Sequence, residues 1–198
     1  MRVIAGTARS IPLKAPAGME TRPTADKIKE TLFNILQFEV QGAVFADLFA
    51  GSGAIGIEAL SRGADRALFI DSAKPAVDVI RDNVRKCHFE DRSEIVRADV
   101  MSAVSHIGRM LREAGPDASL IIFMDPPYDK GLEFPVLASL TAAGILNEDS
   151  LVIVEESLRC DMSPAEELGF TVFREKLYKN QKHVFMRWEP VGATSRSR

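Results

Sequence analysis

From residue 43 onward, short apolar runs alternate along the chain with longer stretches in which apolar and charged positions have a helical spacing. Short runs rich in Val, Ile and Phe predict buried strands, and the longer stretches predict helices. Strands that alternate with helices form βα units, so the pattern predicts an α/β fold with a mainly parallel sheet. The expected strands are VFADLF (44–49), ALFID (67–71), EIVRAD (94–99), SLIIFMD (119–125) and LVIVEE (151–156).

Two amphipathic segments illustrate the helical spacing. AVDVIRDNVRKC (76–87) places apolar residues on one face and charges on the other. In TADKIKETLFNIL (24–36), Thr24 is the expected N-cap, and Asp26 lies at the positive end of the expected helix.

The two ends of the chain depart from the βα pattern. FTVFREKLY (170–178) and HVFMRW (183–188) read as two strands around a polar turn, which predicts an antiparallel hairpin and a sheet of seven strands. We expect a basic arm or small hairpin over residues 1–22, a main domain over 23–189 and a disordered tail over 190–198.

The bulk properties narrow the class of protein. A chain of 198 residues that is 46% hydrophobic can bury one well-formed core. No run approaches the roughly 20 apolar residues of a membrane span, and the first ten residues lack a signal-peptide core, so we expect a cytoplasmic protein. Cys87 and Cys160 lie far apart and match no metal or redox spacing, nor do the three histidines, so no metal is expected.

The net charge of −3 conceals an uneven distribution. Residues 1–30 carry six basic and three acidic side chains, and residues 174–198 carry seven and two. The middle of the chain carries twelve basic and twenty-three acidic side chains. Basic ends on an acidic body permit a polyanionic partner such as nucleic acid, and two solvated termini explain the charges equally well.

A glycine-rich segment follows the first expected strand. In DLFAGSGAIGIEAL, Gly51, Gly53 and Gly56 have G-x-G-x-x-G spacing and a helix opens after them. Glycines here allow a tight turn and let backbone N–H groups approach a ligand closely. Asp71 ends the second expected strand 20 residues after Gly51, where an acid can hold ribose hydroxyls.

Asp47 distinguishes between two cofactors that fit such a loop. It lies in the first expected strand, four residues before Gly51. A nearby carboxylate would repel the pyrophosphate of a nicotinamide dinucleotide, whereas it would favour the ammonium of S-adenosylmethionine. Asp99, which ends the third expected strand, can accept from an adenine amino group or cap the helix that follows it.

The stretch FMDPPYDKG ends the fourth expected strand in an unusual way. Two prolines cannot continue a central strand, so the chain must leave the sheet at Asp125. Asp47, Asp71, Asp99 and Asp125 then all lie at the C-terminal ends of consecutive strands, where open α/β sheets bind ligands. One cleft holding all four acids is the expected site.

These motifs carry a family resemblance. DLFAGSGAIGIEALSRGA followed by DPPY resembles S-adenosylmethionine-dependent methyltransferases that modify amino nitrogens. With MRVIAGTARS and TRPTADKIKETLFN added, residues 1–188 resemble the RsmD family, the 16S ribosomal RNA guanine-N2 methyltransferases of the bacterial small subunit. The implied fold is the Rossmann-like methyltransferase fold over residues 23–189.

The resemblance implies a role for each motif. Asp125 and the Pro126 carbonyl would accept the two hydrogens of an exocyclic amine, and the target base would stack on Tyr128. The implied catalytic residues are Asp125, Pro126, Pro127 and Tyr128. The implied cofactor-binding residues are Asp47, Phe49, Gly51, Gly53, Asp71 and Asp99, and the implied RNA-binding residues are Arg2, Arg9, Arg22 and Thr24.

The arm departs from the family in one respect. Where relatives have a basic run, this chain reads RSIPL (9–13), with Ile11 and Pro12 at basic positions. The expected partner is 16S ribosomal RNA within a small-subunit assembly particle, and the chain is expected to act as a monomer, away from membranes.

Other functions remain open from the sequence. An adenine-N6 methyltransferase and a protein-glutamine amide methyltransferase use a similar motif, although amide enzymes usually have Asn at the position of Asp125. A non-catalytic RNA-binding module would be expected to have lost the glycine loop or the Asp-Pro-Pro-Tyr motif, and both are intact. A dehydrogenase is disfavoured because nothing near the fourth strand resembles a hydride-transfer acid or base.

Overall fold

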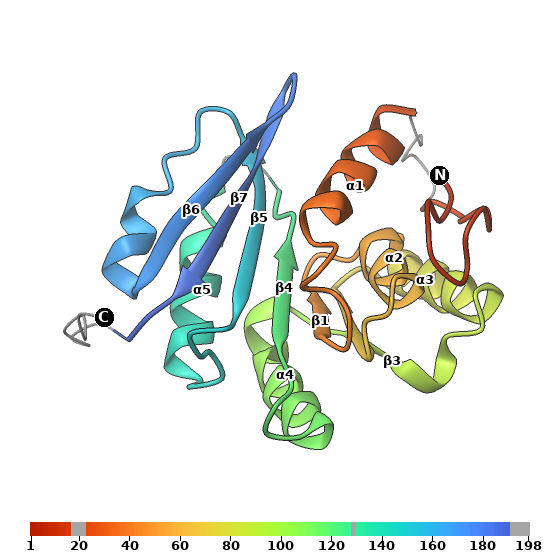
Figure 1. Ribbon diagram of the computed structural model, residues 1–198, viewed down its shortest axis with the longest axis horizontal. Coiled ribbons are helices and arrows are strands. Elements are labelled where there is room, and N and C mark those ends of the chain that lie inside the picture. Colours follow the sequence, from red (N-terminus) through yellow and green to blue (C-terminus); the bar gives the residue numbers. More distant parts are fainter. Residues whose placement is uncertain (17–22, 128–129, 191–198) are drawn as a thin grey trace.

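A seven-stranded sheet organises the molecule (Figure 1). The computed structural model describes residues 1–16, 23–127 and 130–190, with only the backbone of 23–25. The strand order is β3-β2-β1-β4-β5-β7-β6. The strands are β1 (Val44–Asp47), β2 (Arg66–Asp71), β3 (Ser93–Arg97), β4 (Leu120–Met124), β5 (Leu151–Ser157), β6 (Phe170–Leu177) and β7 (Gln181–Trp188).

The sheet is parallel except at one end. β3, β2, β1, β4 and β5 pair in parallel, and β7 pairs antiparallel with both β5 and β6. The expected Rossmann-like fold, with a mainly parallel seven-stranded sheet and a C-terminal antiparallel hairpin, is therefore confirmed. The strand order also makes β1 and β4 direct neighbours, with Asp47 opposite Phe123. Because both strands end at one edge, the loops that follow them lie side by side.

Helices cover both faces of the sheet. The helices are α1 (Pro23–Ile35), α2 (Ala54–Ser61), α3 (Lys74–Lys86), α4 (Val100–Ala114) and α5 (Glu133–Ala142), with 3₁₀ turns η1 (Glu90–Arg92) and η2 (Ser163–Leu168). Apolar residues of α1, α2 and α3 pack on one face with Phe45, Phe69 and Phe123. Those of α4 and α5 pack on the other face with Ile70 and Ile122.

The expected elements form close to their predicted bounds. β1 ends at Asp47 and β3 at Arg97, each two residues before its expected end, and two elements start at other residues than expected. α1 begins at Pro23, so Thr24 lies inside the helix and is not its N-cap. Proline suits the first helical position because its fixed φ matches the helix and its missing N–H would have no partner there. β7 begins at Gln181, two residues before the expected start, because Gln181 pairs with β5 and Lys182 pairs with both β5 and β6.

The N-terminal segment folds back on itself and packs against α2 (Figure 1). Arg2 and Pro12 form an antiparallel bridge. The amides of Ile4 and Ala5 donate to the carboxylate of Glu58 over 2.8 and 3.0 Å. This carboxylate is fully buried, so it serves the segment as a fixed internal acceptor.

A second anchor joins the same segment to the glycine loop. Asn83 of α3, also fully buried, accepts from the Lys14 amide over 2.8 Å. Its amide group donates to the carbonyls of Lys14 and Ser52 over 3.0 and 2.9 Å. Because Ser52 lies between two loop glycines, the segment and the loop share one hydrogen-bonded side chain.

The expected tail, residues 190–198, lies almost wholly outside the described part of the chain. Among the helices that the structure describes, none combines the length and the apolar character needed to cross a bilayer.

Candidate active site

The four acids singled out from the sequence lie along one edge of the sheet. Asp47 and Asp71 are the last residues of β1 and β2, and Asp125 follows β4 directly. Asp99 follows β3 by two residues and precedes α4. The structure thus places each acid at the C-terminal end of its strand, as expected for the ligand-binding edge of an α/β sheet.

The glycine loop is held by Asp71. One carboxylate oxygen accepts from the Gly51 amide over 2.9 Å and the other accepts from the Ala73 amide over 2.8 Å. Gly51 has a φ of +54°, and a Cβ added to it would meet only the Phe49 carbonyl, at 4.0 Å. Gly53, with a φ of +75°, opens α2 and lies against Ile80. The loop backbone at Gly51 is therefore open to a ligand, and its conformation favours glycine.

Asp47 is buried beneath this loop. One of its oxygens accepts from the Gly56 amide over 3.1 Å. Burial raises the pKa of Asp47 to about 7, the Gly56 hydrogen bond opposes the rise, and Asp71 adds to it. A cationic ligand group beside Asp47 would favour the ionised form, so this acid suits the ammonium expected there. Phe49, the next expected contact, is half-buried.

Asp99 is the N-cap of α4. Its carboxylate accepts from the Met101 amide over 2.9 Å, and the side chain is exposed. The first amides of a helix have no intrahelical partner, and one Asp99 oxygen accepts from such an amide. The helix-capping alternative for Asp99 is therefore confirmed for that oxygen.

Asp125 marks the point where the chain leaves the sheet. β4 ends at Met124, and Pro126 is buried while Asp125 and Pro127 face solvent. Removal of water by the surrounding protein raises the pKa of Asp125 to about 8, and Glu155, Asp47 and Glu156 add to the rise. Solvent reaches the exposed side of this carboxyl and moderates the shift, so its upward direction is the property that matters. Tyr128 lies outside the described residues.

A carboxylate and an imidazole lie beside Asp125 on the adjacent strands. β4 pairs with β5 up to Met124 and Val154, which brings Glu155 next to Asp125 in register. Glu155 contacts the His183 ring nitrogen Nε2 over 2.7 Å and accepts from the side-chain Nε2 of Gln181 over 2.5 Å. His183 is buried beside Phe123, with ring centroids 5.8 Å apart. Glu155 and His183 were not predicted as site residues from the sequence, although the two consecutive acids at the end of LVIVEE were a signal.

The residues expected to bind RNA are placed only in part. Arg2 and Arg9 are exposed in the N-terminal segment. Arg22 lies outside the described residues, and for Thr24 only the backbone is described.

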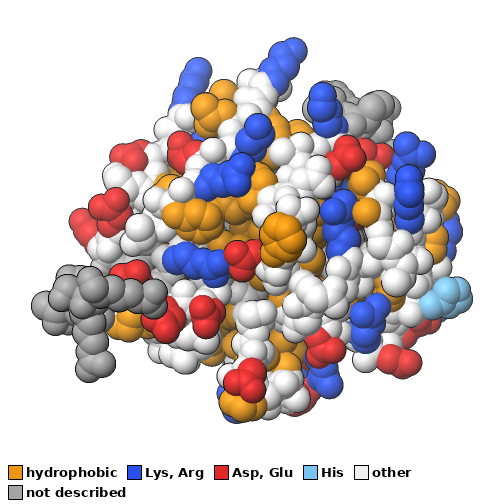
Figure 2. Space-filling model, in the orientation of Figure 1, with side chains coloured by type: hydrophobic (Ala, Val, Ile, Leu, Met, Phe, Trp, Pro, Cys, Tyr) orange, Lys and Arg blue, Asp and Glu red, His pale blue; other side chains and the backbone are white. Residues whose placement is uncertain are grey.

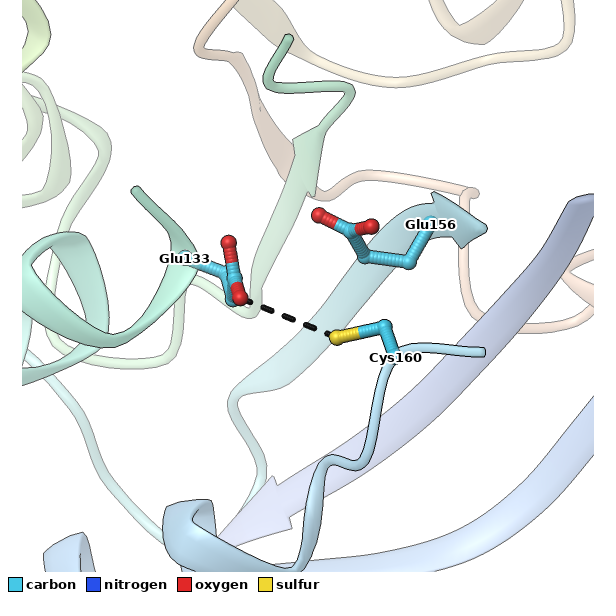
Figure 3. Close-up of side chains that lie close together, drawn as sticks. All are labelled: Glu133, Glu156 and Cys160. Carbon is cyan, nitrogen blue, oxygen red and sulfur yellow. Dashed lines mark hydrogen bonds between the residues drawn. The ribbon is translucent and has the colours of Figure 1, made fainter. Parts of the chain in front are cut away.

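A separate cluster of two carboxylates and a thiol lies on the face of the sheet that α4 and α5 cover. Figure 3 shows Glu133 of α5, Glu156 of β5 and Cys160 of the following loop close together. The Cys160 thiol donates to Glu133 over 3.7 Å. Burial and then the charges of Glu156 and Glu133 raise the pKa of Cys160 to about 12, so the thiol stays protonated.

Comparisons with known proteins identify the family. The sequence model of a family described as conserved hypothetical protein 95 matches residues 1–187. The ribosomal RNA small subunit methyltransferase D of Escherichia coli is 31% identical over 89% of this chain and 84% of its own length. That of Haemophilus influenzae is 31% identical over 89% and 88%. The chain belongs to this family, the RsmD family.

The solved structures agree with this assignment. An Escherichia coli structure described as "Putative methyltransferase yhhF" superimposes with a TM-score of 0.77 at 29% identity. The superposition covers 96% of this chain and 98% of the chain in that structure. The RsmD resemblance and the methyltransferase fold expected from the glycine loop and the Asp-Pro-Pro-Tyr motif are confirmed, and the chain is an S-adenosylmethionine-dependent methyltransferase.

Proposed function

We propose that this RsmD-family chain transfers a methyl group from S-adenosylmethionine to the exocyclic N2 amino group of a guanine in 16S ribosomal RNA. The observation that carries the proposal is the adjacency of β1 and β4. It places the glycine loop that follows β1 beside the Asp125-Pro126-Pro127 exit from β4, at one sheet edge. A donor held by the loop and an amine held at Asp125 can therefore meet.

The residues of this edge fit the cofactor. The open backbone at Gly51 allows close approach, Asp47 favours an ammonium, and Asp71 holds the loop in place. Phe49 and Gly53 frame the same loop, and Asp99 would lie near the adenine end. The cofactor supplies an activated methyl group on a sulfonium, so the protein needs chiefly to position the acceptor nitrogen.

The acceptor side uses the motif after β4. The lone pair of a guanine amine is delocalised into the ring, which makes the amine a poor nucleophile. The Asp125 carboxylate and the Pro126 carbonyl would accept its two hydrogens and favour a pyramidal nitrogen. Pro126 and Pro127 restrict the backbone that carries these acceptors. We also propose, from the sequence alone, that the target base stacks on Tyr128.

The RNA is proposed to be presented by a small-subunit assembly particle. Arg2 and Arg9 are exposed in the N-terminal segment, which Asn83 joins to the cofactor loop, and with Arg22 and Thr24 they are the proposed RNA contacts of this segment. Ile11 and Pro12 stand in the same segment, which reduces its charge, so ribosomal protein is proposed to contribute to docking. The chain is proposed to act as a cytoplasmic monomer.

The test is methyl transfer from labelled S-adenosylmethionine, followed by nucleoside analysis. The acceptors are small subunits, and separately free RNA, from a strain that lacks this protein. We expect label in N2-methylguanosine and a better yield with subunits. Label in N6-methyladenosine, label in protein, or no label despite cofactor binding would refute the guanine assignment.

The Asp125→Ala variant tests the assigned acceptor. We expect loss of at least 100-fold in kcat with little change in cofactor affinity, because the side chain contacts the amine and not the donor. Asp117→Ala is the matched control, since Asp117 is exposed and precedes β4 at the opposite end of the strand. Transfer by Asp125→Ala at the rate of the Asp117→Ala control would overturn the role.

A further inference from the structure

One face of the β6–β7 hairpin has no helix packed on it among the residues that the structure describes. In Figure 1 no helix lies in front of β6 and β7, whereas α5 lies behind them. Figure 2 shows Lys and Arg side chains beside hydrophobic ones on this front face. The hairpin residues 170–188 carry five basic side chains and one acidic side chain. Lys182 is buried, and the other four basic side chains are exposed or half-exposed, so the hairpin presents a basic and partly apolar surface that suits a binding partner.

Three of the basic residues have no ion-pair partner within the described part of the chain. Arg174, Lys176 and Lys179 form no such contact there, whereas Lys182 pairs with Glu175 over 2.7 Å and Arg187 with Glu39 over 3.0 Å. Arg174 and Lys179 are exposed and Lys176 is half-exposed. Three unneutralised cations on one short hairpin produce a positive potential that favours a polyanion.

Aromatic groups lie among these cations. Phe173 is 53% exposed, although a large apolar ring at a strand position gains more when buried. The guanidinium of Arg187 lies over the Phe173 ring, 5.9 Å from the ring centroid. The Phe185 ring lies beside Phe173, with the two ring centroids 6.3 Å apart. An exposed ring flanked by an arginine is a platform on which a nucleic-acid base can stack.

The hairpin also lies at the catalytic edge. Gln181, the first residue of β7, pairs with Ser157 at the C-terminal end of β5. β5 runs parallel to β4, whose C-terminal end leads into Asp125. The turn between β6 and β7 therefore projects beyond the edge at which the proposed substrate amine is held. The N-terminal segment packs on α2 and α3, toward the other end of the strand order.

We propose that the exposed face of the β6–β7 hairpin is a second RNA-binding surface, on which a base stacks on Phe173 and phosphates contact Arg174, Lys176 and Lys179. This inference rests on the proposed function and deepens it, because it assigns the substrate a contact on the side of Asp125 away from the N-terminal segment. RNA held on both sides fixes the target nucleotide over the catalytic edge.

The test compares two triple variants of the full chain. The hairpin variant is Arg174→Ala/Lys176→Ala/Lys179→Ala. The control is Arg66→Ala/Arg109→Ala/Arg112→Ala, which removes the same charge from β2 and α4, outside the proposed site. The affinity for free small-subunit RNA is measured by fluorescence anisotropy across a salt series. We expect the slope of log Kd against log salt to fall by about 2 to 3 in the hairpin variant and to be unchanged in the control.

Phe173→Ala tests the stacking contact without a change of charge. We expect RNA affinity to fall at least fivefold with an unchanged salt slope, while Phe173→Tyr keeps most of the affinity. Phe38→Ala is the matched control, since Phe38 is 87% exposed and follows α1. Thermal melting of every variant establishes that folding is retained.

The possible outcomes distinguish a failure of the hairpin proposal from a failure of the proposed methyl-transfer function. If the parent protein methylates guanine and the hairpin variant matches the control in affinity and slope, the hairpin proposal is wrong and the function stands. If the hairpin variant loses transfer only on assembled subunits and binds free RNA normally, the surface faces protein and the proposal is again wrong. A parent protein without guanine transfer refutes the proposed function instead.

Discussion

Removal of the Glu58 charge is expected to destabilise the fold more than any surface substitution. Glu58 is fully buried and its carboxylate accepts from the Ile4 and Ala5 amides. The same carboxylate pairs with Lys29 at 3.2 Å and with Arg62 at 2.8 Å. In Glu58→Gln the single amide oxygen can accept from only one of the two backbone amides, which donate to different carboxylate oxygens in the parent, and the buried ammonium loses its counter-ion.

The cost follows from the burial of Lys29. Its side chain is 3% exposed, and burial lowers the pKa of Lys29 while Glu58 opposes that shift. Removal of one partner from a buried pair costs about 3–5 kcal/mol. Arg62 is more exposed and can turn toward water, so we expect about 3 kcal/mol. For a domain of this size that corresponds to a drop in Tm of roughly 6–12 °C.

Urea unfolding at pH 7 measures the loss, and amide exchange at Ile4 and Ala5 shows whether the N-terminal segment opens first. Glu148→Gln is the control, because Glu148 is exposed. The double variant Glu58→Gln/Lys29→Met should recover part of the loss, since no unpaired buried charge remains. A change below 1 kcal/mol in Glu58→Gln would refute the reasoning.

Two further predictions concern pH. The pKa of Asp47 in the folded state is raised to about 7, so between about pH 4 and 7 the folded state binds more protons than the unfolded state, and stability falls as pH rises through that window. Asp47→Asn should remove this fall, measured as the difference between the urea midpoints at pH 5 and pH 8. An unchanged difference between the two midpoints would contradict the prediction. Glu155→Gln removes one negative charge that raises the pKa of Asp125, so the acid limb of the pH profile of kcat/KM should move to lower pH. An acid limb that stays at the parental pH would refute the electrostatic effect of Glu155 on Asp125.

The sequence located the catalytic edge because each clue was local. Asp47, Asp71 and Asp125 each lie within or at the end of a short apolar run that predicts a strand, and parallel strands bring their C-terminal ends together. The prolines after Asp125 fixed the exit point to within one residue. Thr24 shows the limit of such reasoning, because two neighbouring residues each suited a helix start and Pro23 occupied it.

The residues that the sequence did not reveal all act across long separations. Glu58 is the single charged residue of the otherwise apolar helix α2, and the sequence does not show that it binds backbone amides more than 50 residues away. Asn83 lies 69 residues from Lys14, and its role depends on how α3 meets the N-terminal segment. Helix periodicity describes which face is buried and does not say which distant backbone groups will need a partner there.

The distribution of charge gains a spatial meaning from the strand order. The acidic edge at β1 and β4 lies between the N-terminal segment, packed on α2 and α3, and the basic hairpin of β6 and β7. A negative centre favours the ammonium and sulfonium of the cofactor but repels phosphates. Cations on both sides allow an RNA backbone to cross this centre without lying in it, so only an extruded base would need to enter. A net charge of −3 is therefore compatible with RNA binding, because the two signs act on different parts of the substrate pair.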